Sequence, residues 1–243
     1  MGAAKNDPSY KVYLGMPLRR DSQDIYLART GIEQALRKAM PEFHGVFLDV
    51  GCGMQPYREL ITGQPKVDRY IGLDLEKAVD PAYSRIAPDI TWNGTKIPLE
   101  TASIDSAMAT EVLEHCPDPT EVLREIWRVL RPGGVLFLTV PFLWPLHDVP
   151  YDEYRYTPFA MDRMLKDAGF TQVRSEPMGG WDASLAQMIG LYVMRAPMGH
   201  RKRRVLSALA LPLVKHLIKR DRKPDVMSKP MITGLSAIAY RPR

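Results

Sequence analysis

Cysteine is scarce in this sequence, which contains Cys52 and Cys116 as its two cysteines among 243 residues. Two cysteines cannot build a disulfide framework, and neither belongs to a CxxC pair of the kind that holds structural zinc. The first thirty residues also lack the apolar core of a secretory signal. We therefore expect a protein of the reducing cytoplasm.

Internal repeats and low-complexity tracts are absent as well. With 45% hydrophobic and 25% charged residues, the chain has enough apolar material for one sizeable core, and we predict a single domain over residues 1–243. The net charge of +5 is uneven: nine Lys and Arg residues and one acid, Asp221, lie between residues 201 and 223. This stretch carries +8 and the rest of the chain −3, which indicates a local basic surface rather than a basic domain.

Apolar runs of strand length alternate with helical patterns along most of the chain. Residues 1–20 are polar and are expected to be loose. The predicted strands cover residues 46–50, 70–73, 89–92, 104–110, 135–140, 170–175 and 235–240. The predicted helices cover residues 21–40, interrupted at Gly31, then 118–130, begun by Asp118 and ended by residues 131–134, and 158–168. This alternation predicts a parallel, doubly wound sheet that binds its ligand at the carboxyl ends of the strands.

A Gly-x-Gly turn follows the first predicted strand in the stretch VFLDVGCGMQP, residues 46–56. Glycine lets the backbone approach a ligand without a Cβ between them. A dinucleotide site needs a third glycine three residues after the second, and that position is Pro56. No Gly-Lys-Ser/Thr of a phosphate loop lies nearby. Both phosphate-binding interpretations are therefore disfavoured.

An acid, Asp74, ends the second predicted strand 23 residues after Gly51. A carboxylate at this place can accept hydrogen bonds from both ribose hydroxyls. The combination favours a nucleoside with a non-phosphate extension, and S-adenosylmethionine fits that description.

Four stretches in order carry a resemblance to a known family: FLDVGCG, YIGLDL, IPLETASIDSAMATEVLEH and EIWRVLRPGGVLFLTVP. They resemble the successive motifs of the class I S-adenosylmethionine-dependent methyltransferases, especially the small-molecule and ubiquinone-type subgroup. The resemblance spans residues 45–170, about half of the chain. It implies a Rossmann-like, mostly parallel seven-stranded sheet with an antiparallel last strand, S-adenosylmethionine as cofactor and S-adenosylhomocysteine as product.

The resemblance also implies roles for individual residues. Asp49, Gly51, Cys52 and Gly53 match the first motif, around the methionine end of the cofactor, where Asp49 would orient the ammonium. Asp74 matches the ribose-binding acid and Leu75 the apolar residue against the adenine. Asn93 stands where the family commonly has an aspartate that accepts a hydrogen bond from the adenine amino group, and an Asn oxygen can also accept it. Thr110 and Glu111 would border the methyl group.

Methyl transfer to a hydroxyl usually needs a general base, and His147 follows the fifth predicted strand in a loop rich in ionisable groups. We predict it as the base, against the alternative that it only fastens this loop. The residues predicted to contact the acceptor are His115, Tyr154, Arg155 and Trp181. No metal is expected, because His147, Asp148 and Asp152 lie in an aromatic loop where carboxylates more often pair with arginine.

Nearly sixty residues separate the sixth and last predicted strands. We expect a helical insertion over residues 177–230, acting as a lid, a substrate wall or packing on the core. Within it, the apolar run 205–214 lies between basic clusters and is too short to span a bilayer. Residues 201–223 suit peripheral contact with anionic lipid, a homodimer contact, binding of an acidic substrate, or simply a solvated basic helix. Nucleic acid is disfavoured, because residues 110–113 lack the motif of amino-methylating DNA enzymes.

The sequence thus predicts a methyltransferase that acts on a small-molecule or sugar-like acceptor, most simply at oxygen. The alternatives are an N-methyltransferase, a methyltransferase for a membrane- or lipid-linked acceptor, and a non-catalytic cofactor-binding partner subunit. We divide the domain into a first helix (21–44), a cofactor-binding core (45–176), the insertion (177–230) and the last strand (231–243). The predicted location is cytoplasmic, with contact at the inner face of the membrane as an option.

Overall fold

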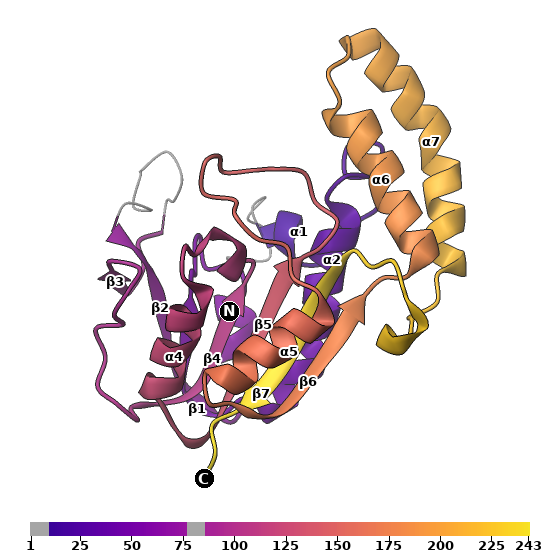
Figure 1. The fold of residues 1–243 in the computed structure, drawn as a ribbon. Helices are drawn as coiled ribbons and strands as arrows, with labels where there is room; N and C mark the ends of the chain where they lie inside the picture. The colour runs from indigo at the N-terminus through magenta and orange to yellow at the C-terminus, as the bar shows by residue number, and fades with distance from the viewer. Residues whose placement is uncertain (1–9, 77–85) are drawn as a thin grey trace.

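Seven strands form one sheet in the computed structural model, which describes residues 10–76 and 86–243 (Figure 1). The strand order is β3-β2-β1-β4-β5-β7-β6; β7 pairs antiparallel with β5 and β6, and the other neighbouring strands pair in parallel. The predicted mostly parallel sheet with an antiparallel last strand is therefore confirmed. The strands are β1 (Gly45–Val50), β2 (Val67–Leu75), β3 (Ile90–Trp92), β4 (Ile104–Thr110), β5 (Leu130–Pro141), β6 (Thr171–Met178) and β7 (Gly234–Tyr240).

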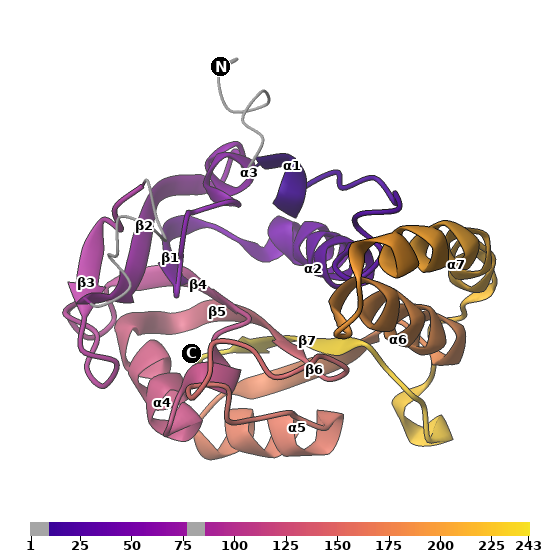
Figure 2. The ribbon, with the colours of Figure 1, turned by 90° about the horizontal axis from the view of Figure 1, so that it is seen from above.

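Helices cover both faces of this sheet, as Figure 2 shows from above. The α-helices are α1 (Tyr10–Tyr13), α2 (Tyr26–Ala39), α3 (Arg58–Thr62), α4 (Pro119–Val129), α5 (Pro158–Asp167), α6 (Trp181–Arg195) and α7 (His200–Arg220). Short 3-10 turns are η2 (Met40–Glu42), η4 (Leu113–His115) and η5 (Val226–Ser228). The helices α2 and α3 lie on one face, and α4 and α5 lie on the other.

Alternating side chains of β1 belong to the two halves of the core. Phe47 packs with Leu36 of α2 and Ile61 of α3, whereas its neighbour Leu48 packs with the buried residues of α4 and α5. All of these side chains are fully buried. Because successive residues of a strand point to opposite faces, one strand holds both helical layers.

The helix ends follow local chemistry that the sequence predicts. Asp118 caps α4 by accepting a hydrogen bond from the Glu121 N–H at 3.0 Å, and Pro119 is the first helical residue. The helix ends at Val129, as residues 131–134 predict. These four residues nevertheless belong to β5, which starts at Leu130 instead of residue 135, because the strand bulges opposite β4 there.

The first long helix differs from its prediction at two points. It starts at Tyr26 rather than Asp21, and it runs through Gly31 without a break. A Cβ at Gly31 would lie 3.4 Å from Met178 Sδ, so this position faces the end of β6. Of the residues expected to be loose, 1–9 lie outside the described part of the chain, 10–13 form α1, and 14–20 lie outside the helices and strands.

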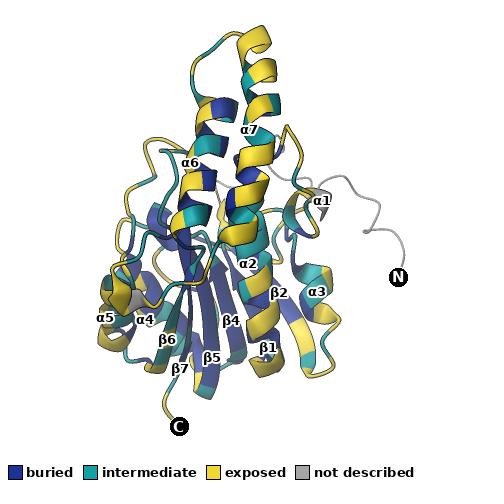
Figure 3. Cartoon of the chain, turned by 90° about the vertical axis from the view of Figure 1, so that its right-hand side faces the viewer, coloured by how far each residue is buried: buried dark blue, intermediate teal, exposed yellow. Residues whose placement is uncertain are grey.

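The helices α6 and α7 form an antiparallel hairpin that projects past the carboxyl edge of the sheet (Figures 1 and 3). This confirms a helical insertion before the last strand. Gln187 Nε2 donates to the Asp24 carbonyl at 2.8 Å, and Gln23 Nε2 donates to the Ser207 carbonyl at 2.9 Å. The hairpin therefore packs against the segment before α2. No helix of the described residues is long and apolar enough to cross a membrane. The assignment of residues 1–243 to one domain stays a prediction.

Two glycines in helix interiors provide a test of this packing. Alanine usually stabilises a helix interior by about 1 kcal/mol relative to glycine. We expect Gly31→Ala to keep or raise the free energy of unfolding, because its Cβ would make an ordinary contact with Met178. We expect Gly190→Ala to lower it by more than about 1 kcal/mol, because its Cβ would lie 2.2 Å from the backbone oxygen of Gln23. Urea unfolding compares the two variants, and equal free energies would contradict the packing of α6 on residues 23–24.

Candidate active site

Most of the predicted site residues lie at or after the ends of β1, β2, β4 and β5. The chain reverses its strand order at β1, which pairs with β2 on one side and β4 on the other. The crevice beside such a reversal is where doubly wound sheets bind ligands. In Figure 1 this edge lies at the top of the sheet, below the loop that joins β5 to α5.

Asp49, near the end of β1, is 1% exposed. Its Oδ2 accepts a hydrogen bond from the Tyr70 hydroxyl, and its Oδ1 has no hydrogen-bond partner in the described residues. Burial raises the pKa of Asp49 to about 7, the Tyr70 hydrogen bond opposes this, and the charge of Asp74 adds to it. A cationic group at the free oxygen would satisfy this carboxylate. The arrangement fits the predicted contact with the cofactor's ammonium.

The loop after β1 turns on glycines with positive φ. Gly51 has φ +67°, and a Cβ there would lie 2.5 Å from Val112 Cγ2, so the turn requires glycine. The Gly53 N–H donates to Asp74 Oδ2 at 2.7 Å, and the Leu75 N–H donates to Oδ1 at 2.8 Å. Asp74 thus fastens the loop to the end of β2, and each of its oxygens keeps a lone pair for a ribose hydroxyl.

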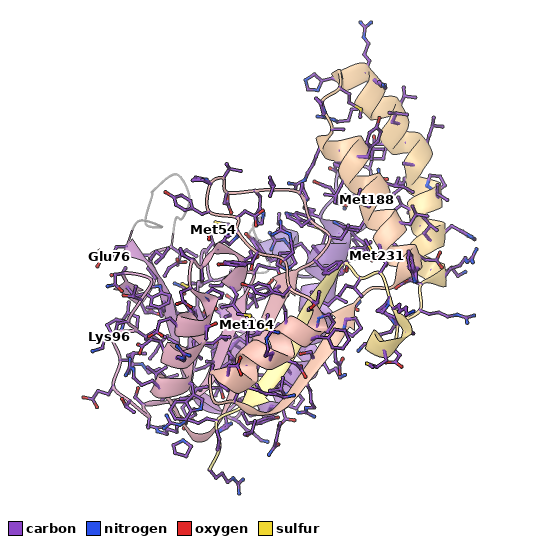
Figure 4. The ribbon with its side chains drawn as sticks, viewed as in Figure 1. Met54, Glu76, Lys96, Met164, Met188 and Met231 are labelled. Atoms are coloured by element: carbon purple, nitrogen blue, oxygen red, sulfur yellow. The ribbon has the colours of Figure 1, made fainter. Side chains whose placement is uncertain are left out.

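Cys52 lies under this loop rather than at its surface. Its side chain is 3% exposed, and its Sγ would be 3.0 Å from a Cβ at Gly72. Burial raises the pKa of the thiol far above its ordinary value. Cys52 is therefore a packing residue of the loop, and a contact of its backbone with the cofactor stays a prediction. Met54, on the same loop, is labelled in Figure 4.

The predicted adenine contacts lie at the ends of β2 and β3. Leu75 is 43% exposed, so its side chain is available to a flat apolar ligand. Asn93 Oδ1 accepts hydrogen bonds from the Thr95 N–H and hydroxyl and from the Lys96 N–H, at 2.8–3.1 Å. The Asn93 oxygen therefore holds a local turn, and its role toward the adenine amino group stays a prediction.

Two carboxylates follow β4. Glu111 has φ +56° and accepts a hydrogen bond from the Thr139 hydroxyl at 2.8 Å, directly after Thr110. Glu114 is fully buried, and both of its carboxylate oxygens lack a hydrogen-bond partner in the described residues. Burial raises the pKa of both acids, and the charge of Glu111 raises that of Glu114 further.

His147 lies in the loop between β5 and α5, beside an ion pair. Its Nδ1 is 3.0 Å from Asp152 Oδ2. Arg155 donates to both oxygens of Asp152, at 2.6 and 2.8 Å, and these hydrogen bonds hold the pKa of Asp152 well below its ordinary value. An ionised Asp152 favours the tautomer with the proton on Nδ1, so Nε2 of a neutral His147 is left as an acceptor.

His115 completes a cluster with His147. The two imidazole rings meet edge to face with centroids 4.8 Å apart, and His115 Nε2 lies 3.8 Å from Glu114 Oε1. Ligand atoms of Glu114, His115 and His147 all lie within 4.8 Å of one another. A carboxylate and two imidazoles could hold a transition-metal ion. The expectation of no metal, which considered Asp148 and Asp152, remains untested.

The other predicted acceptor contacts are more scattered. Arg155 is engaged with Asp152, and Tyr154 donates its hydroxyl to the Pro117 carbonyl at 3.1 Å. Trp181 is the first residue of α6 and is 66% exposed. In the described residues no hydrogen bond or ring contact joins Trp181 to His147.

Some site residues had no usable signal in the sequence. Tyr70, whose hydroxyl donates a hydrogen bond to Asp49, lies in the middle of β2, and its position in the sequence predicts a core residue. Arg29 comes from α2; its guanidinium lies 4.2 Å from the centre of the Tyr13 ring, and its charge lowers the pKa of Glu111. Only the packing of α1 and α2 over the sheet brings this cation to the site. The spacing of Glu111 and Glu114, three residues apart, is a signal that could have identified Glu114.

Part of this chain is similar to known proteins. Residues 48–138 match the family model described as a methyltransferase domain. A Mycolicibacterium smegmatis protein named as a probable S-adenosylmethionine-dependent methyltransferase is 33% identical over 51% of this chain and 51% of its own. The ubiquinone biosynthesis O-methyltransferase of Xanthomonas oryzae pv. oryzae is 50% identical over 38% of this chain and 41% of its own. The chain spans about half of the length of the first relative and less than half of the length of the second.

A solved structure shares the fold. It is Haemonchus contortus phosphoethanolamine N-methyltransferase 2 in complex with S-adenosyl-L-methionine, with a TM-score of 0.55, 14% identity, and coverage of 98% of this chain and 61% of that one. The fold is that of the class I S-adenosylmethionine-dependent methyltransferases. Residues 48–138 of this chain belong to a methyltransferase domain of that class, whose cofactor is S-adenosylmethionine.

The raised pKa of Asp49 has a measurable effect on stability. An aspartate of the unfolded chain ionises near pH 4, whereas Asp49 in the folded chain ionises near 7. Between these values the folded state binds the extra proton, so this contribution to stability is lost as the pH rises through about 7. We expect Asp49→Asn to become more stable relative to the parent protein between pH 5 and pH 8, by about 3 kcal/mol.

Urea unfolding at the two pH values measures this difference. Asp68→Asn, at an exposed aspartate of β2, is the matched control for the change of residue type. A stability difference between Asp49→Asn and the parent that does not change with pH would contradict the raised pKa of Asp49.

Proposed function

We propose that this protein transfers a methyl group from S-adenosylmethionine to an oxygen of a small-molecule or sugar-like acceptor. The observation that carries the proposal is the pairing of His147 with Asp152, because it presents an imidazole nitrogen beside the cofactor-binding edge. The name of one relative, ubiquinone biosynthesis O-methyltransferase, supports oxygen as the target, although the two chains match over only part of their lengths.

The proposed cofactor-binding residues determine where the methyl donor lies. In this proposal, Asp49 binds the ammonium through its unpartnered Oδ1, Asp74 binds the ribose, and Leu75 contacts the adenine. The Arg29 guanidinium, on the same side as Glu111, offers a countercharge for an anionic group. When bound, S-adenosylmethionine supplies an electrophilic methyl group, so the protein chiefly has to align the acceptor with it.

A hydroxyl acceptor must also lose its proton. His147 Nε2 accepts this proton in the proposed reaction, and the resulting imidazolium is stabilised by Asp152, to which Nδ1 donates. Arg155 keeps Asp152 ionised and holds the loop by donating to the carbonyls of Trp144 and Pro145. His115, whose ring contacts that of His147, and the exposed side chains of Tyr154 and Trp181 are the proposed acceptor contacts.

An amine acceptor is the main alternative, since a neutral amine needs no base to attack the methyl group. The buried carboxyl group of Glu114, which has no hydrogen-bond partner in the described residues, favours this alternative, because it could stabilise the positive charge that develops on the amine nitrogen during methylation. A lipid-linked acceptor and a non-catalytic cofactor-binding subunit are further alternatives. We propose a cytoplasmic location for the protein and leave a homodimer as a hypothesis.

Asp74→Ala tests the cofactor-binding assignment. We expect the variant to bind S-adenosylmethionine at least about tenfold more weakly, because it loses hydrogen bonds to a charged group and frees the loop at Gly53. Isothermal titration calorimetry measures the affinity, with Asp68→Ala on the same strand as the control. Unchanged affinity in Asp74→Ala would remove this residue from the cofactor site.

His147→Ala tests the proposed base. With an oxygen acceptor identified by screening, we expect kcat to fall by about 10² or more and the decline of the rate at low pH to disappear. The measurement is S-adenosylhomocysteine formation across pH. His44→Ala, at an exposed histidine just before β1, is the control. Full activity of His147→Ala toward hydroxyl acceptors would exclude His147 as the base, and turnover limited to amines would favour the alternative.

A further inference from the structure

The outer face of α7 carries an apolar stripe that nothing in the described chain covers. Val205, Leu209 and Leu213 are 57%, 71% and 50% exposed. They are spaced four residues apart, so they share one face of the helix. We call these three residues the outer stripe.

The outer stripe lies opposite the face of α7 that packs within the protein. Ser207, Val214 and Leu217 are buried, and the last two form a small core with Ala186 of α6. Figure 3 shows the projecting hairpin with α7 largely exposed along its length. Packing on α6 already uses the other side of the helix, so the outer stripe serves no internal core.

Basic residues flank the outer stripe at both ends. Arg201 and Lys202 precede it and Lys219 and Arg220 follow it, and all four are exposed. The helix contains no acidic residue. Of these four side chains, only Arg220 forms a salt bridge within the described residues, and its partner is Asp182 at 3.9 Å. A partner for this face must therefore accept both apolar and cationic contacts.

We propose that the outer face of α7 binds an anionic lipid bilayer surface, lying in the interface with the outer stripe in the acyl boundary. The charge pattern selects this partner: lysine and arginine on both flanks meet lipid phosphates while the apolar middle is buried. A second copy of the chain would bring an identical cationic face, and an antiparallel pair of α7 helices would set the Arg201 end against the Arg220 end. Like charges there would repel.

A second exposed apolar stripe, on α6, lacks this charge pattern. It comprises Trp181, Leu185, Met188 and Tyr192, with one acid and one base within the helix, Asp182 and Arg195. Arg195 already forms a salt bridge with Asp24 at 2.9 Å, and its guanidinium lies over the Trp144 ring. The side chain of Met188, labelled in Figure 4, is 48% exposed and provides a matched position on the same hairpin.

Vesicle flotation of the full chain tests the proposal. At low salt we expect the protein to float with vesicles of phosphatidylglycerol and phosphatidylcholine in about equal amounts, and to stay behind with phosphatidylcholine alone. Leu209→Glu should lower the bound fraction at least about tenfold, and Arg201→Ser with Lys202→Ser should weaken binding and its salt dependence. Met188→Glu should float as the parent protein does.

Several results would overturn the proposal: no flotation with phosphatidylglycerol, unchanged flotation of Leu209→Glu, or an equal loss in Met188→Glu. A dimer in light scattering that Leu209→Glu converts to a monomer, without flotation of the parent, would assign the face to a second copy instead. Thermal unfolding by circular dichroism verifies that each variant is folded, which the exposure of Leu209 leads us to expect. The test is independent of methyl transfer, so it can fail while the proposed activity stands.

Discussion

The parallel pairing of β1 with β2 on one side and β4 on the other is the constraint on which the site depends. Asp49 is paired with Gly72 of β2 and with Met108 of β4, so the three strands end close together at one edge. Parallel strands return through helices, which places all their carboxyl ends at the same edge. Because the order reverses at β1, the helices after β1 and β4 lie on opposite faces of the sheet, and doubly wound sheets bind ligands beside such a reversal.

Acids gather at this edge in two different states. Burial raises the pKa of Asp49 and of Glu114, and a cation approaching either carboxyl group would favour its ionised form. Asp152 is also nearly inaccessible, yet Arg155 holds it ionised. The ionised acid is the one that orients His147, and the unsatisfied acids are the ones that a cationic ligand would stabilise. Environment, more than residue type, separates these roles.

The hairpin of α6 and α7 joins parts of the chain that are far apart in sequence. Gln187 and Arg195 of α6 bond the backbone and the carboxylate of Asp24, and Gln23 bonds α7. The segment before α2, which also leads to Arg29 at the site, is therefore held by an insertion more than 150 residues later in the chain. The same insertion therefore holds the segment before α2 and carries the exposed face of α7.

The strands, the helices of the core and the cofactor loop could be predicted from the sequence, because strand and helix periodicity and glycine or proline punctuation are local. Asp49, Gly51 and Asp74 stand at strand ends, where the order of elements alone determines their edge. The partnerless state of Glu114, the bond from Tyr70 to Asp49 and the approach of Arg29 could not be predicted, since they depend on which side chains meet across the sheet. The predicted break at Gly31 was wrong for the same reason. The low helix propensity of glycine is a local property, whereas the contact of this position with β6 depends on the tertiary structure. The sequence by itself determined the class of fold and the edge of the sheet at which Asp49, Gly51 and Asp74 lie. Only the tertiary structure decided which acids lack partners and which face of α7 stays exposed, because burial arises from the packing of distant segments.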